Sequence, residues 1–481
     1  MPRSARDIQL IELKDTISKL NELIMTQTKS MDSLQKTIED LRQELSNKEA
    51  EVDYLKAKLF GSSGEKLKSP FPGQMNLFEE MPDDRLPEII EPEIIDVSAH
   101  KRERKPKATY ECPACKDSPE PQFVKDRGAA PLVPHSYVSA GLAAHVMYGK
   151  FINALPYYRQ EKDFENQFGV KIGRGTMAHR TICCSENYFT PMINYFHRLL
   201  TGRKFVAGDE TPIQVLKEAD RRPQSKSYVW LFRSGDDGLN PIIVYQYHPT
   251  RNGDAAVKFF QGSAPGTYIN VDGYAGYNKL KDFKRCCCYA HIRRYFLEAI
   301  PKGKEKDYTD PAVQGFLYCN KLFEYERSYR GKGLSYKQIY SRRLKDQKPV
   351  VEAFLAWIDK QTAPGGSRLA RALTYAGNQR LYMMTYLEDG RCSISNNLSE
   401  NSIRSVTVGR RNWLFCDTTD GADASMMVYS PLETARANGL NPQKYLEYLL
   451  EARPNQNMSD EELENMAPWS PKVQECCVNK S

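Results

Sequence analysis

A seven-residue repeat of apolar side chains near the start of the chain restricts its fold more than any other feature. Between residues 8 and 60 the seam of the repeat is broken only by Gln27 and Lys48, and no Pro or Gly interrupts it. A strict repeat over about seven heptads is typical of a supercoiled rod. We predict a coiled coil over residues 7–60, in which Ile and Leu at the core positions favour a parallel dimer. A helix that folds back on its own chain is the alternative.

The next fifty residues, 61–110, have the composition of a linker. A Gly-Ser-Ser-Gly run ends the heptads at residue 64, and residues 69–97 are rich in Pro and acidic side chains. Such a segment buries too little apolar surface to fold alone, so we predict a flexible acidic linker. It is followed by a basic tract at 101–107, which suits either phosphate contacts or a solvated surface.

Cys112 and Cys115 form a CxxC pair within residues 111–135. A structural zinc ion takes four ligands, usually from two such pairs, and no second pair lies nearby. The segment is therefore either a zinc site completed from elsewhere or a remnant with free thiols. The chain has twelve cysteines, several of them adjacent, which is typical of reduced thiols in a cytosolic protein.

Residues 136–200 have the pattern of successive helices. One helix is expected after Ser139, another after Pro156, and a third from the run that begins at Gly173. A helix, a turn with Gly, and a helix with basic residues near its start resemble a helix-turn-helix, which would direct Arg174 and Arg180 to DNA. A plain packing layer of helices fits the same pattern.

The sequence pattern of residues 201–415 predicts an α/β domain. Antiparallel-like strands followed by strands that alternate with helices indicate a mixed sheet. A helix is expected at 254–260 and another after His291, and helical periodicity across 301–390 indicates a helical insertion before the sheet domain resumes. The predicted strands are 204–209, 212–216, 227–233, 241–247, 267–272 and 285–290.

Three carboxylates stand in short motifs within this domain. Asp209 and Asp272 follow β-branched or aromatic runs that read as strands, and Glu400 opens a basic, helix-like segment. Carboxylates gathered from strand ends and a helix suit hard Mg²⁺, which prefers oxygen ligands. Two such ions about 3.5–4 Å apart can hold the attacking and leaving oxygens of a phosphoryl transfer. Glu210 would point to the opposite face of its strand from Asp209.

The segment that begins at Glu400 combines acidic, basic and aromatic residues. Ser399 is expected to cap the helix, and Arg404 lies one turn after Glu400 on the same face. Arg410, Arg411 and Trp413 follow and suit contacts with phosphates and bases. An ordinary helix with a Glu–Arg pair is the alternative.

Taken together, these motifs resemble the transposase of insertion-sequence family sixty-six. The likeness continues into the C-terminal segment, 416–481, and back to the Leu-Phe-Gly-Ser-Ser-Gly-Glu-Lys-Leu run that closes the heptads. The motifs of the central region, in chain order, are Gly208-Asp-Glu-Thr-Pro, Val271-Asp-Gly-Tyr, Cys288-Tyr-Ala-His-Ile-Arg-Arg, Asn396-Asn-Leu-Ser-Glu and Gly409-Arg-Arg-Asn-Trp.

The resemblance implies an RNase H-like catalytic core of the DDE type. Asp209, Asp272 and Glu400 would bind Mg²⁺ or Mn²⁺, and the enzyme would cut and join DNA at the ends of its element. Water would attack a phosphodiester, and the freed 3′-hydroxyl would then attack target DNA. The motif match also places His291 and the pair at 293–294, Arg293 and Arg294, on the substrate side. The zinc region departs from the family pattern, which has two CxxC pairs.

The partners implied are the terminal repeats of the element, target DNA, a second copy of the chain through the coiled coil, and accessory proteins of the same element. The net charge of +7 permits a polyanionic partner. No apolar run is long enough for a transmembrane helix, and a bacterial, cytoplasmic, nucleoid-associated protein is expected. A non-catalytic dimeric DNA-binding protein and an RNase H-like nuclease that cleaves without joining are the alternatives.

Overall fold

A computed structural model describes residues 109–111, 123–125 and 131–478 of the chain. Two short strands, β1 (Thr109–Glu111) and β2 (Phe123–Lys125), pair in antiparallel fashion. The predicted coiled coil, nearly all of the predicted linker, and Cys112 with Cys115 lie outside the described residues. None of the helices in the described part is long and apolar enough to cross a bilayer.

The predicted mixed α/β sheet is confirmed. Its order is β5-β4-β3-β6-β7, in which β3, β4 and β5 are antiparallel neighbours and β6 and β7 run parallel to β3. A further strand, β8 (Cys416–Thr418), pairs with the far end of β3. The path strands are β3 (Phe205–Lys217), β4 (Lys226–Ser234), β5 (Ile243–His248), β6 (Tyr268–Val271) and β7 (Lys284–Cys287).

The predicted break between strands 204–209 and 212–216 is wrong, because β3 continues through Pro212. Pro lacks an N–H group and normally interrupts a central strand. The Pro212 carbonyl accepts a hydrogen bond from Arg410, on the side of β3 away from β4. Because the N–H and C=O of one residue point to the same side of an antiparallel strand, the missing donor costs the β3–β4 ladder nothing.

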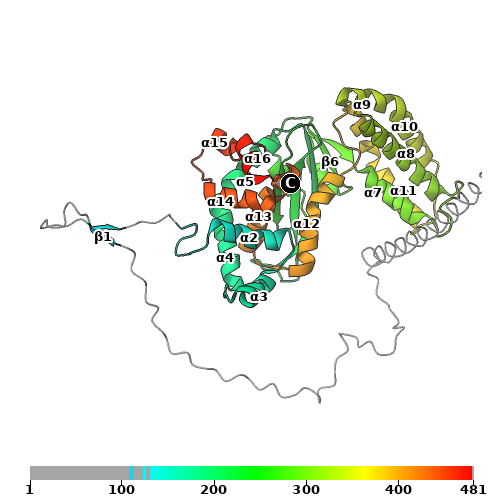
Figure 1. The fold of residues 1–481 in the computed structure, drawn as a ribbon. Helices are drawn as coiled ribbons and strands as arrows, with labels where there is room; N and C mark the ends of the chain where they lie inside the picture. Colours follow the sequence, from blue (N-terminus) through cyan, green and yellow to red (C-terminus); the bar gives the residue numbers. More distant parts are fainter. Residues whose placement is uncertain (1–108, 112–122, 126–130, 479–481) are drawn as a thin grey trace, which may run out of the picture. The chain divides into compact units, whose positions relative to one another are not determined.

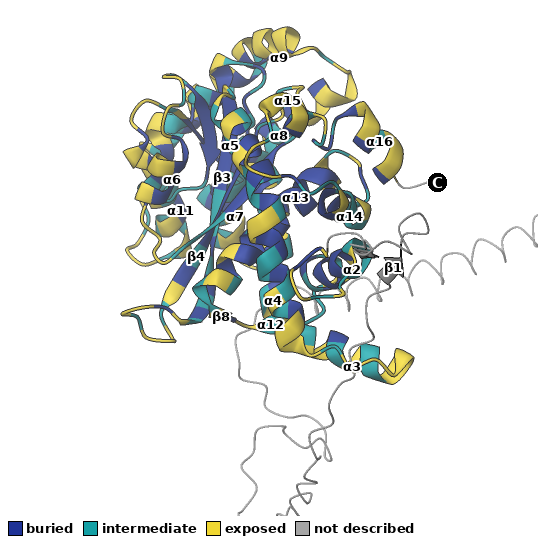
Figure 2. Ribbon diagram, turned by 90° about the vertical axis from the view of Figure 1, so that its left-hand side faces the viewer, coloured by how far each residue is buried: buried dark blue, intermediate teal, exposed yellow. Residues whose placement is uncertain are grey.

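Helices from both ends of the described chain pack on the sheet. The N-terminal group is α2 (Ala140–Phe151), α3 (Tyr157–Phe168), α4 (Arg174–Cys184) and α5 (Thr190–Thr201), which confirms the helices predicted after Ser139, Pro156 and Gly173. The C-terminal group is α13 (Thr419–Ala437), α14 (Pro442–Ala452), α15 (Asp460–Glu464) and α16 (Pro471–Cys477). Both groups share one apolar cluster with the sheet, and Figure 2 shows the strands and α13 as its buried centre.

Side chains of helix α13 form hydrogen bonds with backbone groups of β5, the strand at the outer edge of the sheet. The hydroxyl of Ser430 accepts from the Tyr245 backbone N–H at 3.0 Å. Thr434 accepts from the N–H of Ile243 at 3.1 Å and donates to its carbonyl at 3.0 Å. An exposed strand edge is a site for unwanted pairing, so two hydroxyls from a buried helix replace the missing neighbour of β5.

The predicted helical insertion is also confirmed. After α6 (Asp254–Phe259), β6 and β7, helix α7 (Tyr289–Ala299) leads into the insertion. The insertion helices are α8 (Pro311–Gly331), α9 (Tyr336–Arg342), α10 (Lys348–Ile358) and α11 (Arg368–Gln379), and Figure 1 shows them on the β6 side of the sheet. Helices α7, α8, α10 and α11 form a second apolar cluster with β6, β7 and the segment around residues 383–394.

Candidate active site

Two neighbouring carboxylates on β3 face opposite sides of the sheet. Gly208 and Glu210 lie on the face where Phe232 and Tyr277 pack, as the close approach of the Phe232 ring and the Tyr277 hydroxyl to Gly208 shows. Glu210 accepts from the Tyr277 hydroxyl at 2.6 Å and from the Arg251 guanidinium at 2.6 and 2.9 Å. Asp209 therefore projects from the other face, as strand alternation requires.

Asp272 lies directly after β6, in the turn that leads to a short 3₁₀ helix (Ala275–Lys279). Its carboxylate accepts from the Tyr274 backbone N–H at 2.9 Å, which is the bond of an Asx-turn. Because β6 runs parallel to β3 and is its direct neighbour, Asp272 leaves the sheet close to Asp209.

Glu400 lies in the first turn of helix α12 (Asn397–Trp413). The helix begins two residues before the predicted cap: Asn396 is the N-cap residue, and Ser399 is a fully buried residue of the first turn. The expected capping role of Ser399 is therefore wrong. Asn396 instead donates through Nδ2 to the Gly208 carbonyl at 2.8 Å, so the residue that starts the Glu400 helix is bonded to the strand that carries Asp209.

Helix α12 occupies a gap along the edge of β3. Strand β6 pairs with β3 at residues 205–207 and β8 pairs at 215 and 217. Between them, Asn396 bonds to Gly208 at one end of α12, and Arg410 bonds to Thr211 Oγ1 at 2.9 Å and to the Pro212 carbonyl at the other. Side-chain donors thus replace a strand along this edge, and they fix the position of Glu400 relative to the sheet.

The acidic side chains influence one another's ionisation. Burial raises the pKa of Asp209 to about 8, and the charges of Glu210, Asp272 and Glu400 act in the same direction. Burial also raises the pKa of Glu210, with the charge of Asp272 as the next cause. The geometry agrees with this, because β6 is the parallel neighbour of β3 and Asn396 bonds the start of α12 to Gly208 of β3, so Asp209, Asp272 and Glu400 lie on adjoining elements.

A second set of ligand-type atoms adjoins Glu400. Cys288, His291 and Glu400 each offer one ligand atom, and these atoms lie within 4.8 Å of one another. His291 Nδ1 is 3.5 Å from Glu400 Oε1, and both atoms are buried without a hydrogen-bond partner. Among the described residues, Asp209, Asp272 and Glu400 do not form a group this tight. Burial lowers the pKa of His291, and Arg294 lowers it further.

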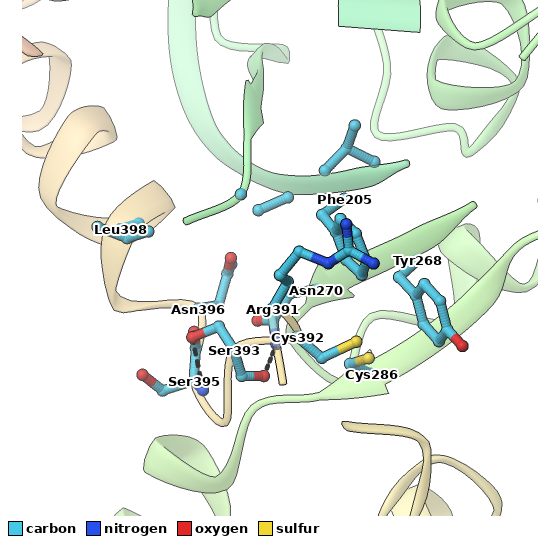
Figure 3. Close-up of a pocket in the computed structure, with 13 residues that line it drawn as sticks. Phe205, Tyr268, Asn270, Cys286, Arg391, Cys392, Ser393, Ser395, Asn396 and Leu398 are labelled. Atoms are coloured by element: carbon cyan, nitrogen blue, oxygen red, sulfur yellow. Dashed lines mark hydrogen bonds between the residues drawn. The ribbon is translucent and has the colours of Figure 1, made fainter. Parts of the chain in front are cut away.

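The segment that precedes α12 packs closely against β3 and β6. Figure 3 shows Asn270, Ser393, Ser395 and Asn396 around a small cavity there. Asn270 Nδ2 donates to the Ser393 carbonyl at 2.7 Å. The cavity measures about 20 Å³, and a space of that size holds about one water molecule. This pocket is therefore part of the packing that supports α12, and it is too small for a substrate.

The predicted DNA-contacting residues of α12 divide into two kinds. Arg404 and Arg411 are exposed. Arg410 is held by β3, and Trp413 packs against the main apolar cluster with the Lys150 ammonium 5.7 Å from its ring centre.

The basic residues outside α12 divide in the same way. Arg294 and Arg174 are exposed, whereas Arg180 is half-buried. Arg293 donates to Asn320 at 3.1 Å and lies over the Phe316 ring, so the insertion engages it.

Neighbouring arginines on α12 provide a matched test. We expect Arg411→Ala to weaken DNA binding equally for all sequences and to lower the salt-dependence slope by about 1, because it removes one exposed cation. Arg410→Ala should instead lower the free energy of unfolding by about 1–3 kcal/mol, since its bonds lie within the protein. Salt titrations and urea denaturation of both variants measure the contrast. An unchanged salt slope in Arg411→Ala would contradict it.

Sequence reasoning missed several residues that shape this site. Asn396 stands in a motif that gives it no role, and nothing in the sequence distinguishes Arg251 from other arginines. Tyr277 belongs to the Asp272 motif, but no spacing rule shows that its hydroxyl reaches Glu210. Each contact joins positions at least 41 residues apart, the separation of Glu210 and Arg251, so only the folded sheet brings them together.

Comparisons with known proteins agree with the sequence motifs. Residues 135–424 match the model of the family described as "Transposase IS66 family", and residues 430–469 match the "IS66 C-terminal element". Two relatives are uncharacterized proteins of Sinorhizobium fredii: y4qI is 26% identical over 70% of this chain and 65% of its own length, and y4hP is 25% identical over 70% and 62%. The chain thus spans less than two thirds of the length of these relatives.

Proposed function

The chain belongs to the IS66 family of transposases, and on that premise we propose that it cuts and joins DNA at the ends of an insertion sequence, with Asp209, Asp272 and Glu400 as its catalytic carboxylates. The observation that supports the proposal is that the three residues stand on adjoining elements: β6 is the parallel neighbour of β3, and Asn396 at the start of α12 donates to the Gly208 carbonyl of β3. The strand order, with three antiparallel strands followed by two parallel ones, supports an RNase H-like core.

The cluster suits a hard divalent cation. Its donors are carboxylate oxygens, and burial beside like charges raises the pKa of Asp209, which is a cost that a cation would remove. Asp209, Asp272 and Glu400 would hold Mg²⁺ or Mn²⁺, which would neutralise charge on the reacting phosphate. Cys288 and His291 beside Glu400 offer sulfur and nitrogen, which Mg²⁺ does not favour.

The remaining polar residues orient the carboxylates. Arg251 and Tyr277 bind Glu210 and keep it on the far face of β3. Asn396 fixes the start of the Glu400 helix. Exposed Arg404 and Arg411 would face DNA phosphates, and the helix-turn-helix-like pair α3 and α4 would add Arg174. The coiled coil would bring two element ends together, and accessory proteins of the same element are a further part of the proposal.

A strand-transfer assay tests the proposed function. Purified full-length protein would be incubated with linear DNA that carries the element ends and with supercoiled target, in Mg²⁺ or in EDTA. Joined product that requires the metal supports the transposase. Cleaved ends without joining would favour a nuclease, and specific binding without either product would favour a non-catalytic DNA-binding protein.

Metal binding should also stabilise the fold. We expect Mg²⁺ or Mn²⁺ at about a hundred times its dissociation constant to raise the free energy of unfolding by roughly 2.7 kcal/mol. Asp272→Asn should abolish this gain, because it removes one ligand and part of the charge that attracts the ion. Thermal denaturation with and without metal measures the effect. A gain that persists in Asp272→Asn would place the ion elsewhere.

A further inference from the structure

The turn that carries Asp272 is in contact with the helical insertion. Tyr375 of α11 lies against Gly273, so closely that a Cβ atom at Gly273 would stand 2.6 Å from the ring and 2.8 Å from its oxygen. Only glycine fits between this ring and the turn.

A buried cation makes the second connection between Asp272 and the insertion. Arg285 of β7 is 7% exposed, and its Nη2 donates to the Asp272 carbonyl at 2.5 Å and to Gln379 of α11 at 3.3 Å. Its guanidinium also lies 4.5 Å from the centre of the Tyr382 ring, just after α11. Among the described residues no carboxylate forms an ion pair with Arg285. A buried guanidinium usually requires a carboxylate partner, whereas this one is held by neutral groups of the turn and the insertion.

The insertion itself is firmly joined to the sheet domain at this point. The Tyr375 ring stacks on Tyr295 of α7 with centroids 4.4 Å apart. Helix α7 follows β7 directly, so α11 is bound both to the end of the sheet and to the Asp272 turn. The packing of the Tyr375 ring between Tyr295 and Gly273 restricts the movement of the Asp272 turn, because densely packed protein interiors are hard to compress and transmit strain.

We propose that Tyr375 and Arg285 are positioning residues through which the helical insertion fixes Asp272 in its metal-binding geometry. The proposal rests on the proposed metal-binding role of Asp272. The helical insertion would then contribute to the reaction. Tyr375 packs against Gly273, and Arg285 donates hydrogen bonds to the Asp272 carbonyl and to Gln379 of the insertion. Residues that orient metal ligands without touching the ion change metal affinity by about 10–100-fold when removed.

Metal titration of the full-length protein tests the proposal without any activity measurement. Mn²⁺ would be titrated calorimetrically into wild type, Tyr375→Ala and Tyr375→Phe, and the heat lost in Asp272→Asn defines the site. Tyr375→Ala should weaken Mn²⁺ binding about tenfold or more. Tyr375→Phe keeps the ring against Gly273 and should bind within about twofold of wild type, a difference of about 0.4 kcal/mol.

Tyr318 provides the matched control. It lies on α8 in the same insertion and is half-buried, and its ring packs against Phe354 and Trp357 with centroids 5.1 and 5.8 Å apart. Tyr318→Ala should lower stability as Tyr375→Ala does, while Mn²⁺ affinity stays at the wild-type value. The comparison separates positioning from general loosening of the insertion.

The outcomes distinguish the two proposals. Weakened Mn²⁺ binding in Tyr375→Ala alone supports the positioning role. Equal affinities in Tyr375→Ala and Tyr318→Ala, with a wild-type site that Asp272→Asn abolishes, would overturn positioning and leave the metal site standing. A wild type with no site sensitive to Asp272→Asn would overturn both, because there would be no ligand geometry for the insertion to hold.

Discussion

Replacing Asp209 with asparagine is expected to reduce strand transfer by about a thousandfold while DNA binding persists. An amide cannot supply the negative charge that a carboxylate gives a divalent cation, and Lewis-acid stabilisation of a phosphoryl transfer is worth several kcal/mol. A loss of about 4 kcal/mol corresponds to about a thousandfold in rate. Asparagine has the same shape, and β3 holds this position through its backbone, so the fold should be retained. Joined product measured over time gives the rate.

A second aspartate serves as the control for this change. Asp254 begins α6, is exposed, and pairs with Lys279 at 2.7 Å. Asp254→Asn makes the same chemical substitution outside the acidic cluster and should leave strand transfer within about twofold of wild type, because exposed ion pairs contribute little. Wild-type rates in Asp209→Asn would refute the proposed triad. A comparable loss of strand transfer in both variants would mean that the assay detects a general loss of folded protein and not the removal of a metal-binding carboxylate.

Much of the fold could be predicted because its signals are local. The strand before Asp272 follows from a run of β-branched residues, and helix α7 follows from 3.6-residue periodicity, although it begins at Tyr289 and contains His291, which was expected to precede it. The predicted break between strands 204–209 and 212–216 is wrong, because β3 runs unbroken through residues 210 and 211 and on through Pro212. At Pro212 one edge of β3 faces the side chain of Arg410 instead of a strand. The hydrophobic periodicity of β3 and of α12 does not show that this helix lies beside this strand.

The candidate site shows the same division between local and long-range information. Short motifs were enough to select Asp209, Asp272 and Glu400 as candidates, since each carboxylate has a recognisable context. The residues that place them have none: Asn396 acts through a carbonyl 188 positions away, and Arg285 reaches Gln379 across 94. The cap prediction failed for a related reason. Ser399 has the right chemistry for a cap, but Asn396 is bonded to β3 and starts the helix earlier.

Removing the carboxylate of Glu326 is expected to cost about 3–5 kcal/mol of stability, because it leaves a buried guanidinium without its partner. Glu326 is 7% exposed and binds Arg343, 2% exposed, through two bonds of 2.8 and 2.9 Å. Gln347 adds a bond of 2.6 Å to the same carboxylate and accepts from Tyr386 at 2.6 Å. This network joins α8 to the segment that returns from the insertion to α12. Urea denaturation of Glu326→Ala measures the cost.

An exposed ion pair in the same insertion provides a control for the stability loss expected in Glu326→Ala. Glu352 and Lys348 lie one turn apart on α10 with 3.9 Å between their charged atoms, and both are well exposed. Glu352→Ala should change stability by less than about 0.5 kcal/mol, as solvated helix pairs do. Equal losses in the two variants would show that the Glu326 network is not the internal support of the insertion.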